Sequence, residues 1–116
     1  MAEEVRRGDL WWVDWEPGRG SEQRDRRPAL VIQNDIGNTY SPTTIVASVT
    51  TRGPRGLPIL VPVSAAESGL PRDSFVNLAH VLTIDRNRLL QRCGSVPAER
   101  MLEVDQALKI SLGIAR

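Results

Sequence analysis

Short runs of β-branched and aromatic residues, separated by turns rich in Gly and Pro, constrain the fold of this chain more than any other feature. The run Thr43–Thr51 is β-branched almost throughout and stops at a Gly- and Pro-containing turn. In Leu10–Trp15, aromatic and β-branched residues alternate so that Trp11, Val13 and Trp15 share one face, which we expect to be core. These patterns favour a mainly β domain built from short strands.

Several further segments continue the pattern. Pro28 opens Ala29–Ile32, an apolar run typical of a buried strand, and Asn34–Asn38 then predicts a loop. Leu57–Val63 contains two prolines, which predicts a strand at a sheet edge. The remaining predicted elements are a helical turn over Ser64–Gly69, strands over Ser74–Leu78 and Val81–Ile84, a turn over Asp85–Arg88, and a last strand over Leu89–Ser95. About five to seven short strands indicate a small β-barrel.

The segment Pro97–Leu112 carries the punctuation of a helix. Pro97 stands at the first turn and Gly113 just past the end. Apolar side chains recur at helical spacing, at Met101, Val104, Leu108 and Leu112. We expect one amphipathic helix that caps the barrel. At 116 residues, with no internal repeat or linker, the sequence predicts a single domain over residues 1–116.

Composition limits the possible compartments and partners. A net charge of +1 gives no reason by itself to expect a nucleic-acid or membrane partner. Cys93 is the only cysteine, which rules out an internal disulfide and fits a reducing compartment. The N-terminus lacks the apolar stretch of a signal peptide, and nowhere do about 18 apolar residues run together. We therefore expect a cytoplasmic protein without a membrane partner.

Several classes of chemistry lack the residues they need. One His, one Cys and no carboxylate cluster at ligand spacing imply no metal, and we expect no cofactor. A Ser-His-Asp hydrolase would need His80 as its base, but the Gly-x-Ser-x-Gly motif is absent. Phosphate-binding loops of the Gly-rich type are absent as well.

Phosphate-type donors gather where two strands begin or end. Arg24, Arg26 and Arg27 close a long loop, and Thr50, Thr51 and Arg52 close the β-branched run. Cleavage of RNA by its own 2'-hydroxyl needs removal of a proton, positive charge at the phosphorane oxygens, and protonation of the leaving oxygen. An Arg readily supplies the charge. The same residues also fit a solvated loop and an ordinary strand end, so the pattern alone leaves both interpretations open.

Ordered motifs extend over residues 6–113. They are Arg7–Trp11, Gly20–Gln23, Arg27–Val31, Gln33–Asn38, Tyr40–Thr43, Ile45–Ala47, Arg72–Ser74, Thr83–Asp85 and Ile110–Gly113. In this order they resemble the MazF/PemK toxin family, and its chromosomal MazF branch in particular. The resemblance implies an SH3-like β-barrel with a C-terminal helix, a symmetric homodimer, and the toxin role in a type II toxin-antitoxin system with a MazE-like antitoxin.

The resemblance also implies an activity and a set of site residues. The activity is ribosome-independent, sequence-specific and metal-independent cleavage of single-stranded RNA, leaving 2',3'-cyclic phosphate and 5'-hydroxyl ends. Arg27 and Thr50 match the catalytic pair, and Glu22 matches a loop Glu that supports activity in some relatives. Trp15 is either core or a stacking plane for a base. The candidate RNA-binding residues are Ser21, Gln23, Asn34, Tyr40, Ser41, Arg52 and His80.

Three departures from the family pattern affect these expectations. The plasmid-borne branch has Arg-x-Asp where this chain has Asn77–Ala79, so the general base is left open. His80 stands where relatives usually have Gln, and it is either an RNA contact or a tolerated surface replacement. The stretch Arg24–Arg26 replaces a Gly-rich one, which adds charge and stiffness to the loop.

Two rival functions remain on the sequence alone. A non-catalytic toxin of the CcdB type shares the barrel and binds DNA gyrase through its helix end. Such a protein has no need of Arg27 and Thr50, and the tail Gly113–Arg116 lacks the aromatic residue that gyrase binding would suggest. A decayed homologue that only binds RNA or its antitoxin is the other alternative, and the intact pair argues against it.

Overall fold

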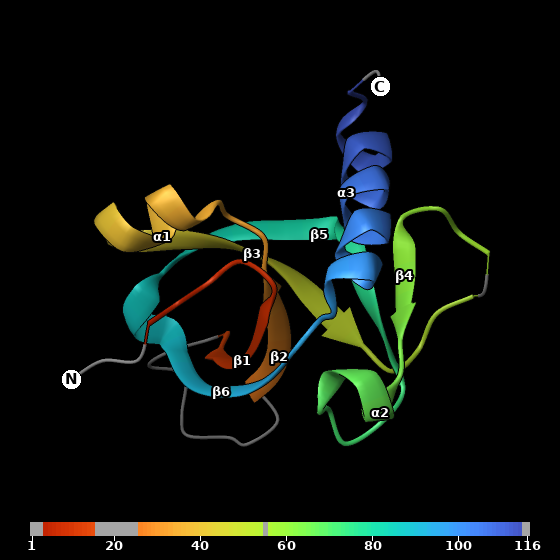
Figure 1. Cartoon of the computed structure of the whole chain (residues 1–116), viewed down its shortest axis with the longest axis horizontal. Coiled ribbons are helices and arrows are strands. Elements are labelled where there is room, and N and C mark those ends of the chain that lie inside the picture. Colours follow the sequence, from red (N-terminus) through yellow and green to blue (C-terminus); the bar gives the residue numbers. More distant parts are fainter. Residues whose placement is uncertain (1–3, 16–25, 55, 115–116) are drawn as a thin grey trace.

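The β-branched run lies in the interior of a six-stranded antiparallel sheet (Figure 1). The computed structural model describes residues 4–15, 26–54 and 56–114. The strand order is β4-β5-β3-β2-β1-β6, so β3 pairs with neighbours on both sides. The strands are β1 (Asp9–Asp14), β2 (Arg26–Val31), β3 (Thr43–Thr50), β4 (Leu60–Val63), β5 (Ser74–Asp85) and β6 (Leu89–Ser95).

The sheet is curled but not closed. Its edges are β4 and β6, and the described residues contain no pairing between these two strands. The mainly β domain with a C-terminal helix is confirmed, whereas the expected closure into a full barrel is not. The edge position predicted for the Pro-containing strand is also confirmed, because Pro62 lies in β4. That strand begins at Leu60 rather than at Leu57.

Two segments predicted as separate strands are the two halves of β5. Ser48 of β3 lies opposite Asn77, but the next residue back, Ala47, lies opposite Val81. Residues 78–80 are therefore extra on the β5 side and form a bulge. The bulge reverses the face of the sheet that the even-numbered residues of β5 occupy. Before the bulge these residues pack into one of the two apolar clusters described below, and after it they pack into the other. A 3₁₀ turn, η2 (Arg86–Arg88), then leads into β6 as predicted.

The loop predicted over residues 34–38 is wrong, because these residues form the start of helix α1 (Asp35–Tyr40). The Asn34 side chain caps the helix by accepting a hydrogen bond from the Gly37 amide over 2.8 Å. Asn38 is buried, and its Oδ1 accepts from the Thr44 hydroxyl over 2.7 Å. These tertiary contacts compensate for the weak helix propensity of Gly and Asn.

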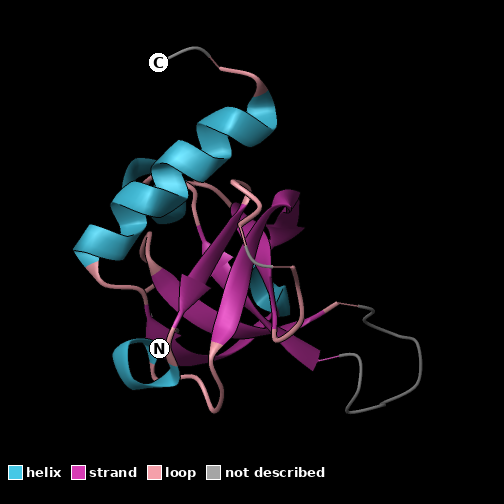
Figure 2. Ribbon diagram, turned by 90° about the vertical axis from the view of Figure 1, so that its right-hand side faces the viewer, coloured by secondary structure: helices cyan, strands magenta, loops and turns pink. Residues whose placement is uncertain are grey.

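The two remaining helices match their predictions. Helix α2 (Ala65–Ser68) has a capping box between Ser64 and Glu67. Helix α3 (Ala98–Leu112) lies across one side of the strands (Figure 2). It buries Val104 and Ala107, whereas Leu112 is exposed.

Two apolar clusters occupy the two faces of the sheet. The larger one lies under α3 and includes Leu10, Leu30 and Leu78. The smaller one includes Trp11 and Val13, which confirms the expected core face of β1, and Trp15 packs at its margin. Among the described residues, no helix has the length and apolar character needed to span a membrane.

Candidate active site

A row of polar side chains borders the smaller apolar cluster. Ala29 of β2 and Val46 of β3 belong to that cluster. Successive side chains of a strand alternate between faces, so residues two or four positions further along point to the same side. By this rule Arg27 on β2, and Ser48 and Thr50 on β3, share the face of the cluster. We call Arg27, Ser48, Thr50, Asn77 and His80 the polar rim.

The two β5 members reach the rim from opposite sides of the bulge. Asn77 lies opposite Ser48 and therefore shares its face. Its Oδ1 accepts a hydrogen bond from the Ala79 amide over 2.9 Å, which shapes the bulge. His80 lies two residues before Leu82, which packs against the smaller cluster. The bulge thus brings side chains from both halves of β5 to one surface.

Arg27 lies near the start of β2, and Thr50 is the last residue of the neighbouring strand β3. The printed register pairs Ala29 with Ser48 and Leu30 with Ala47. The same register, carried two residues further, sets Arg27 opposite Thr50. Directly opposed side chains in an antiparallel pair have Cβ atoms about 5 Å apart. A guanidinium and a hydroxyl so placed can contact the same phosphate group.

The surroundings of this pair leave donors for a ligand. Arg27 is exposed, and Thr50 is half-buried. The Thr50 Oγ1 accepts a hydrogen bond from the Arg52 amide over 3.1 Å. Because this bond uses a lone pair, the hydroxyl proton stays available for donation to a phosphate oxygen. Arg52 itself is exposed immediately beyond the end of β3.

An aromatic pair forms one end of the rim. The rings of Trp15 and His80 are stacked, with centroids 5.9 Å apart and an angle of 21° between their planes. Trp15 is half-buried, and His80 is exposed. Trp15 packs against the smaller apolar cluster, which agrees with the core interpretation. Its other interpretation, a stacking plane for a base, stays a prediction.

The structure separates three predicted RNA-binding residues from the pair. Asn34, Tyr40 and Ser41 lie at α1, next to the start of β3, whereas Thr50 is the last residue of that strand. At about 3.3 Å per residue, the strand keeps the two groups roughly 20 Å apart. Asn34 and Ser41 have local roles, since Ser41 Oγ accepts from the Thr43 amide. Tyr40 is 83% exposed.

The site seen in the structure differs from the predicted one in two respects: some predicted residues lie outside the described part of the chain, and some rim residues were not predicted. Ser21, Glu22 and Gln23 lie outside the described residues. Ser48 and Asn77 are rim members that sequence reasoning missed. Side chains of a strand alternate between its two faces, so counting back two residues from Thr50 would have indicated Ser48. The position of Asn77 depends on the bulge, which no local sequence pattern indicates.

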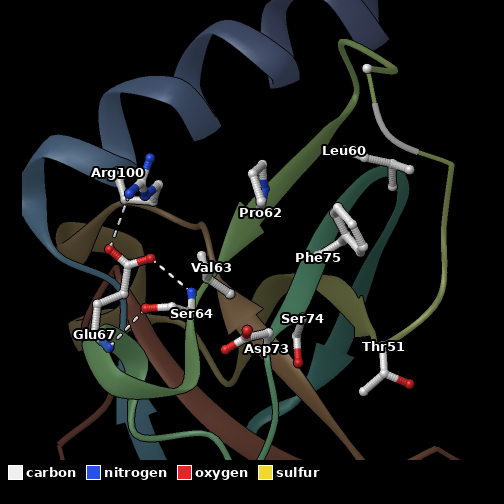
Figure 3. A pocket seen from close by; sticks show the side chains of 11 residues that line it. Thr51, Leu60, Pro62, Val63, Ser64, Glu67, Asp73, Ser74, Phe75 and Arg100 are labelled. Atoms are coloured by element: carbon white, nitrogen blue, oxygen red, sulfur yellow. Dashed lines mark hydrogen bonds and ion pairs between the residues drawn. The ribbon is translucent and has the colours of Figure 1, made fainter.

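A cavity of about 580 Å³ adjoins the end of β3 (Figure 3). Phe75, which lies opposite Thr50, lines it together with Leu60 and Pro62 of the edge strand. Thr51 borders it on the side of β3. The polar rim and this cavity are therefore neighbouring parts of the molecular surface.

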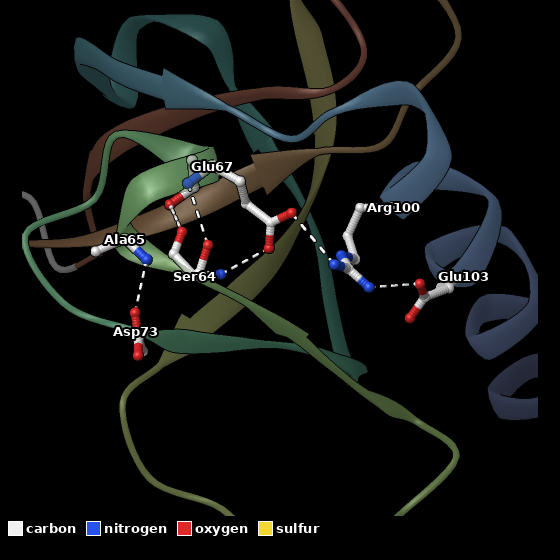
Figure 4. Close-up of polar contacts among 7 residues, drawn as sticks. Ser64, Ala65, Glu67, Asp73, Arg100 and Glu103 are labelled. Carbon is white, nitrogen blue, oxygen red and sulfur yellow. Dashed lines mark hydrogen bonds and ion pairs between the residues drawn. The ribbon is translucent and has the colours of Figure 1, made fainter.

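The charged side chains of the cavity are engaged with one another and with the backbone (Figure 4). The Glu67 carboxylate accepts from the Ser64 amide over 2.8 Å and from Arg100 Nη2 over 3.3 Å. The hydrogen bond from the Ser64 amide, and to a smaller extent the contact with Arg100, hold the pKa of Glu67 below its ordinary value. Arg100 also pairs with Glu103 over 2.6 Å. This network joins α2 to α3, which is a structural role.

No group of three or more His, Cys, Asp or Glu side chains in the described ranges is arranged to hold a metal ion. What the described site offers is a guanidinium, hydroxyls, an amide and an aromatic pair on an open face. Such a set suits a phosphate-containing polymer with bases to stack.

Comparison with solved structures defines the class of fold. A MazF from a MazE-MazF crystal structure of Deinococcus radiodurans superposes with a TM-score of 0.80 at 30% identity, covering 98% of this chain and 100% of that one. A structure titled an endoribonuclease from Mycobacterial species gives a TM-score of 0.81 at 21% identity, covering 100% and 98%. The fold is that of small antiparallel β toxins with a C-terminal helix.

Sequence comparison then gives the family. Residues 6–112 match the PemK-like, MazF-like toxins of type II toxin-antitoxin systems. The chain is 46% identical over 111 residues to the endoribonuclease EndoA of Bacillus subtilis strain 168, covering 95% of this chain and 96% of the relative. The chain therefore belongs to the PemK-like, MazF-like toxin family, as the motifs predicted.

Proposed function

We propose that this toxin is a ribosome-independent, sequence-specific endoribonuclease, and that Arg27 and Thr50 hold the scissile phosphate. The observation that carries the proposal is the register of β2 with β3, whose last pair is Ala29 and Ser48. Continued by two residues, this register sets Arg27 opposite Thr50 on one face of the sheet. The name of the Bacillus relative supports the same activity. We place the protein in the cytoplasm, as one toxin domain over residues 1–116.

The proposed reaction is an internal transfer at phosphorus. The 2'-hydroxyl oxygen attacks the adjacent phosphorus and loses its proton, while the bond to the 5'-oxygen breaks and that oxygen gains a proton. The products are a 2',3'-cyclic phosphate and a 5'-hydroxyl. Arg27 neutralises charge on the phosphorane oxygens and is the proposed proton donor to the leaving 5'-oxygen, while the Thr50 hydroxyl donates to a phosphorane oxygen. Glu22 is proposed to orient Arg27 or to take up the proton. The reaction as written uses no metal ion.

We propose that the functional unit is a homodimer, with RNA lying along the polar rim. Within one protomer, the rim lies roughly 20 Å from Asn34, Tyr40 and Ser41. In a dimer, these residues of one subunit could contact RNA bound at the rim of the other. Ser21, Gln23, Arg52 and His80 complete the proposed RNA contacts. The solved MazE-MazF relative from Deinococcus supports a MazE-like antitoxin as the physiological partner.

The test is cleavage of a long unstructured RNA by the purified protein in EDTA, with the cut ends mapped. Arg27→Ala and Thr50→Ala should abolish discrete cuts, and all ends formed by the unchanged protein should carry a 5'-hydroxyl. Arg72→Ala and Thr83→Ala are the controls, because each changes an exposed residue of the same type that lies outside the polar rim. An RNA that stays intact with the unchanged protein would contradict the proposal and favour the gyrase-binding or decayed alternatives.

A further inference from the structure

The stacked pair of Trp15 and His80 is a preformed aromatic surface on the polar rim. Its rings are 5.9 Å apart and nearly parallel, although the residues are far apart in sequence. Trp15 lies on one side of the imidazole, and His80 is nevertheless exposed. A further ring can therefore approach His80 from the side away from Trp15.

Trp15, the inner ring of this stacked pair, is held in place by packing and by backbone hydrogen bonds. Trp15 packs against the smaller apolar cluster, and its buried indole Nε1 has no hydrogen-bond partner among the described residues. Arg88 of η2 donates from Nε to the Asp14 carbonyl over 3.0 Å and from Nη2 to the Trp15 carbonyl. The backbone at Trp15 is thus held by a residue 73 positions later in the sequence. A rigid support lowers the entropy cost of placing a further ring on His80.

The pair also lies close to the proposed phosphate site. Val13 of β1 is opposite Arg27 of β2, and Trp15 is two residues beyond Val13 on the same face. This makes Trp15 and Arg27 diagonal neighbours, whose separation in an antiparallel pair is about 7–8 Å. An aromatic surface at that distance from a phosphate-binding guanidinium suits a nucleotide, which carries a flat base and a phosphate together.

We propose that a base of single-stranded RNA, flanking the scissile phosphate, stacks on the exposed face of His80 and extends the Trp15–His80 stack by one ring. This inference rests on the proposed function of the rim. It makes His80 a specificity-determining residue whose contribution is a flat surface. A base held equally in the ground state and the transition state affects KM more than kcat.

Substitutions at His80 separate the flat ring from its other properties. His80→Ala should raise KM for RNA by about 5- to 100-fold, the range expected for loss of one stacked base, and leave kcat nearly unchanged. His80→Phe keeps a flat ring without the imidazole nitrogens and should stay within a few-fold of the unchanged protein. Thr83→Ala, an exposed residue of the same strand, is the control. Similar KM values for His80→Ala and the unchanged protein would overturn the proposal.

A second readout does not depend on cleavage. His80 is the only histidine in the sequence, so its imidazole carbon-bound protons give NMR signals that need no assignment by mutation. In Thr50→Ala protein, an unstructured RNA oligonucleotide should shift these signals upfield through the ring current of the stacked base. His80 signals that do not shift in saturating RNA would also overturn the proposal. The same holds if an antitoxin peptide shifts these signals but RNA does not.

The two readouts distinguish this inference from the proposed function. If the unchanged protein cuts RNA but His80→Ala behaves like it, the stacking proposal fails and the nuclease proposal stands. If no protein cuts RNA but the His80 signals shift upfield with it, the stacking proposal stands and the nuclease proposal fails.

Discussion

Glu67 of α2 and Arg100 of α3 form an ion pair, with 3.3 Å between Oε1 and Nη2. The folded protein lowers the pKa of Glu67, chiefly through the Ser64 amide and then through Arg100. A carboxyl whose pKa is lowered by folding stabilises the fold fully above its ordinary value of 4.5, and this stabilisation is lost as pH falls through the folded-state pKa.

Glu67→Gln should therefore reduce the acid sensitivity of the fold. Between about pH 6 and pH 3, the variant should lose less of its free energy of unfolding than the unchanged protein, as measured by urea denaturation at each pH. Glu99→Gln, at an exposed position near the start of α3, is the control. Parallel pH profiles for Glu67→Gln and the unchanged protein would contradict the expected linkage.

Gly94 of β6 leaves no room for a side chain. A Cβ atom built there lies 2.0 Å from the backbone oxygen of Ser68, so either β6 or α2 must move. Gly94→Ala should destabilise the protein by about 1–3 kcal/mol or more, measured by urea or thermal unfolding. Ser95→Ala changes the exposed next residue and should have little effect. Equal stability of the two variants would show that this contact relaxes easily.

Asn38 joins α1 to β3 through buried hydrogen bonds. Its Oδ1 accepts from Thr44, which is fully buried, and from Gln33 Nε2 over 3.0 Å. Asn38→Leu would leave the Thr44 hydroxyl without its acceptor, at an expected cost of about 2–4 kcal/mol in the free energy of unfolding. Thr39→Ala, at an exposed position of the same helix, should cost much less. Denaturant midpoints of the two variants provide the comparison.

The proposed role of Thr50 depends on its hydroxyl proton. Thr50→Ser keeps a donor at the same position, so it should retain most of the RNA cleavage rate. Thr50→Val keeps the shape without the donor and should lower kcat by about 10²- to 10³-fold, the usual effect of removing one such donor. Single-turnover rates on one mapped RNA measure both. Equal cleavage rates for Thr50→Ser and Thr50→Val would show that the hydroxyl takes no part in catalysis.

Local signals were sufficient for most of the fold. The strand at Thr43, the edge strand with Pro62 and the C-terminal helix are readable because composition and spacing decide them. Helix α1 was missed because Gly37 and Asn38 argue against a helix, and the contacts that overcome their propensity come from the start of β3. The bulge of β5 was missed because it is defined by pairing with a distant strand.

The site could be predicted only in part, for a related reason. The family resemblance indicates Arg27 and Thr50, and the register of β2 with β3, continued past Ala29 and Ser48, is consistent with the proposal that they act together. Neither local periodicity nor composition indicates that His80 lies on Trp15, because that contact depends on the curl of the sheet and on the bulge. Asn34, Tyr40 and Ser41 were grouped with the pair in the prediction, but α1 places them at the other end of β3.

The pairing of β1 with β6 determines how early during synthesis the sheet of this protein can be completed. Asp9 near one end of the chain is opposite Ser95 near the other, and Arg88 fixes the backbone at Trp15. During translation, β1 lacks its outer neighbour until β6 has been synthesised. We therefore expect a nascent chain that has not yet reached Ser95 to be inert, because its sheet lacks one edge strand.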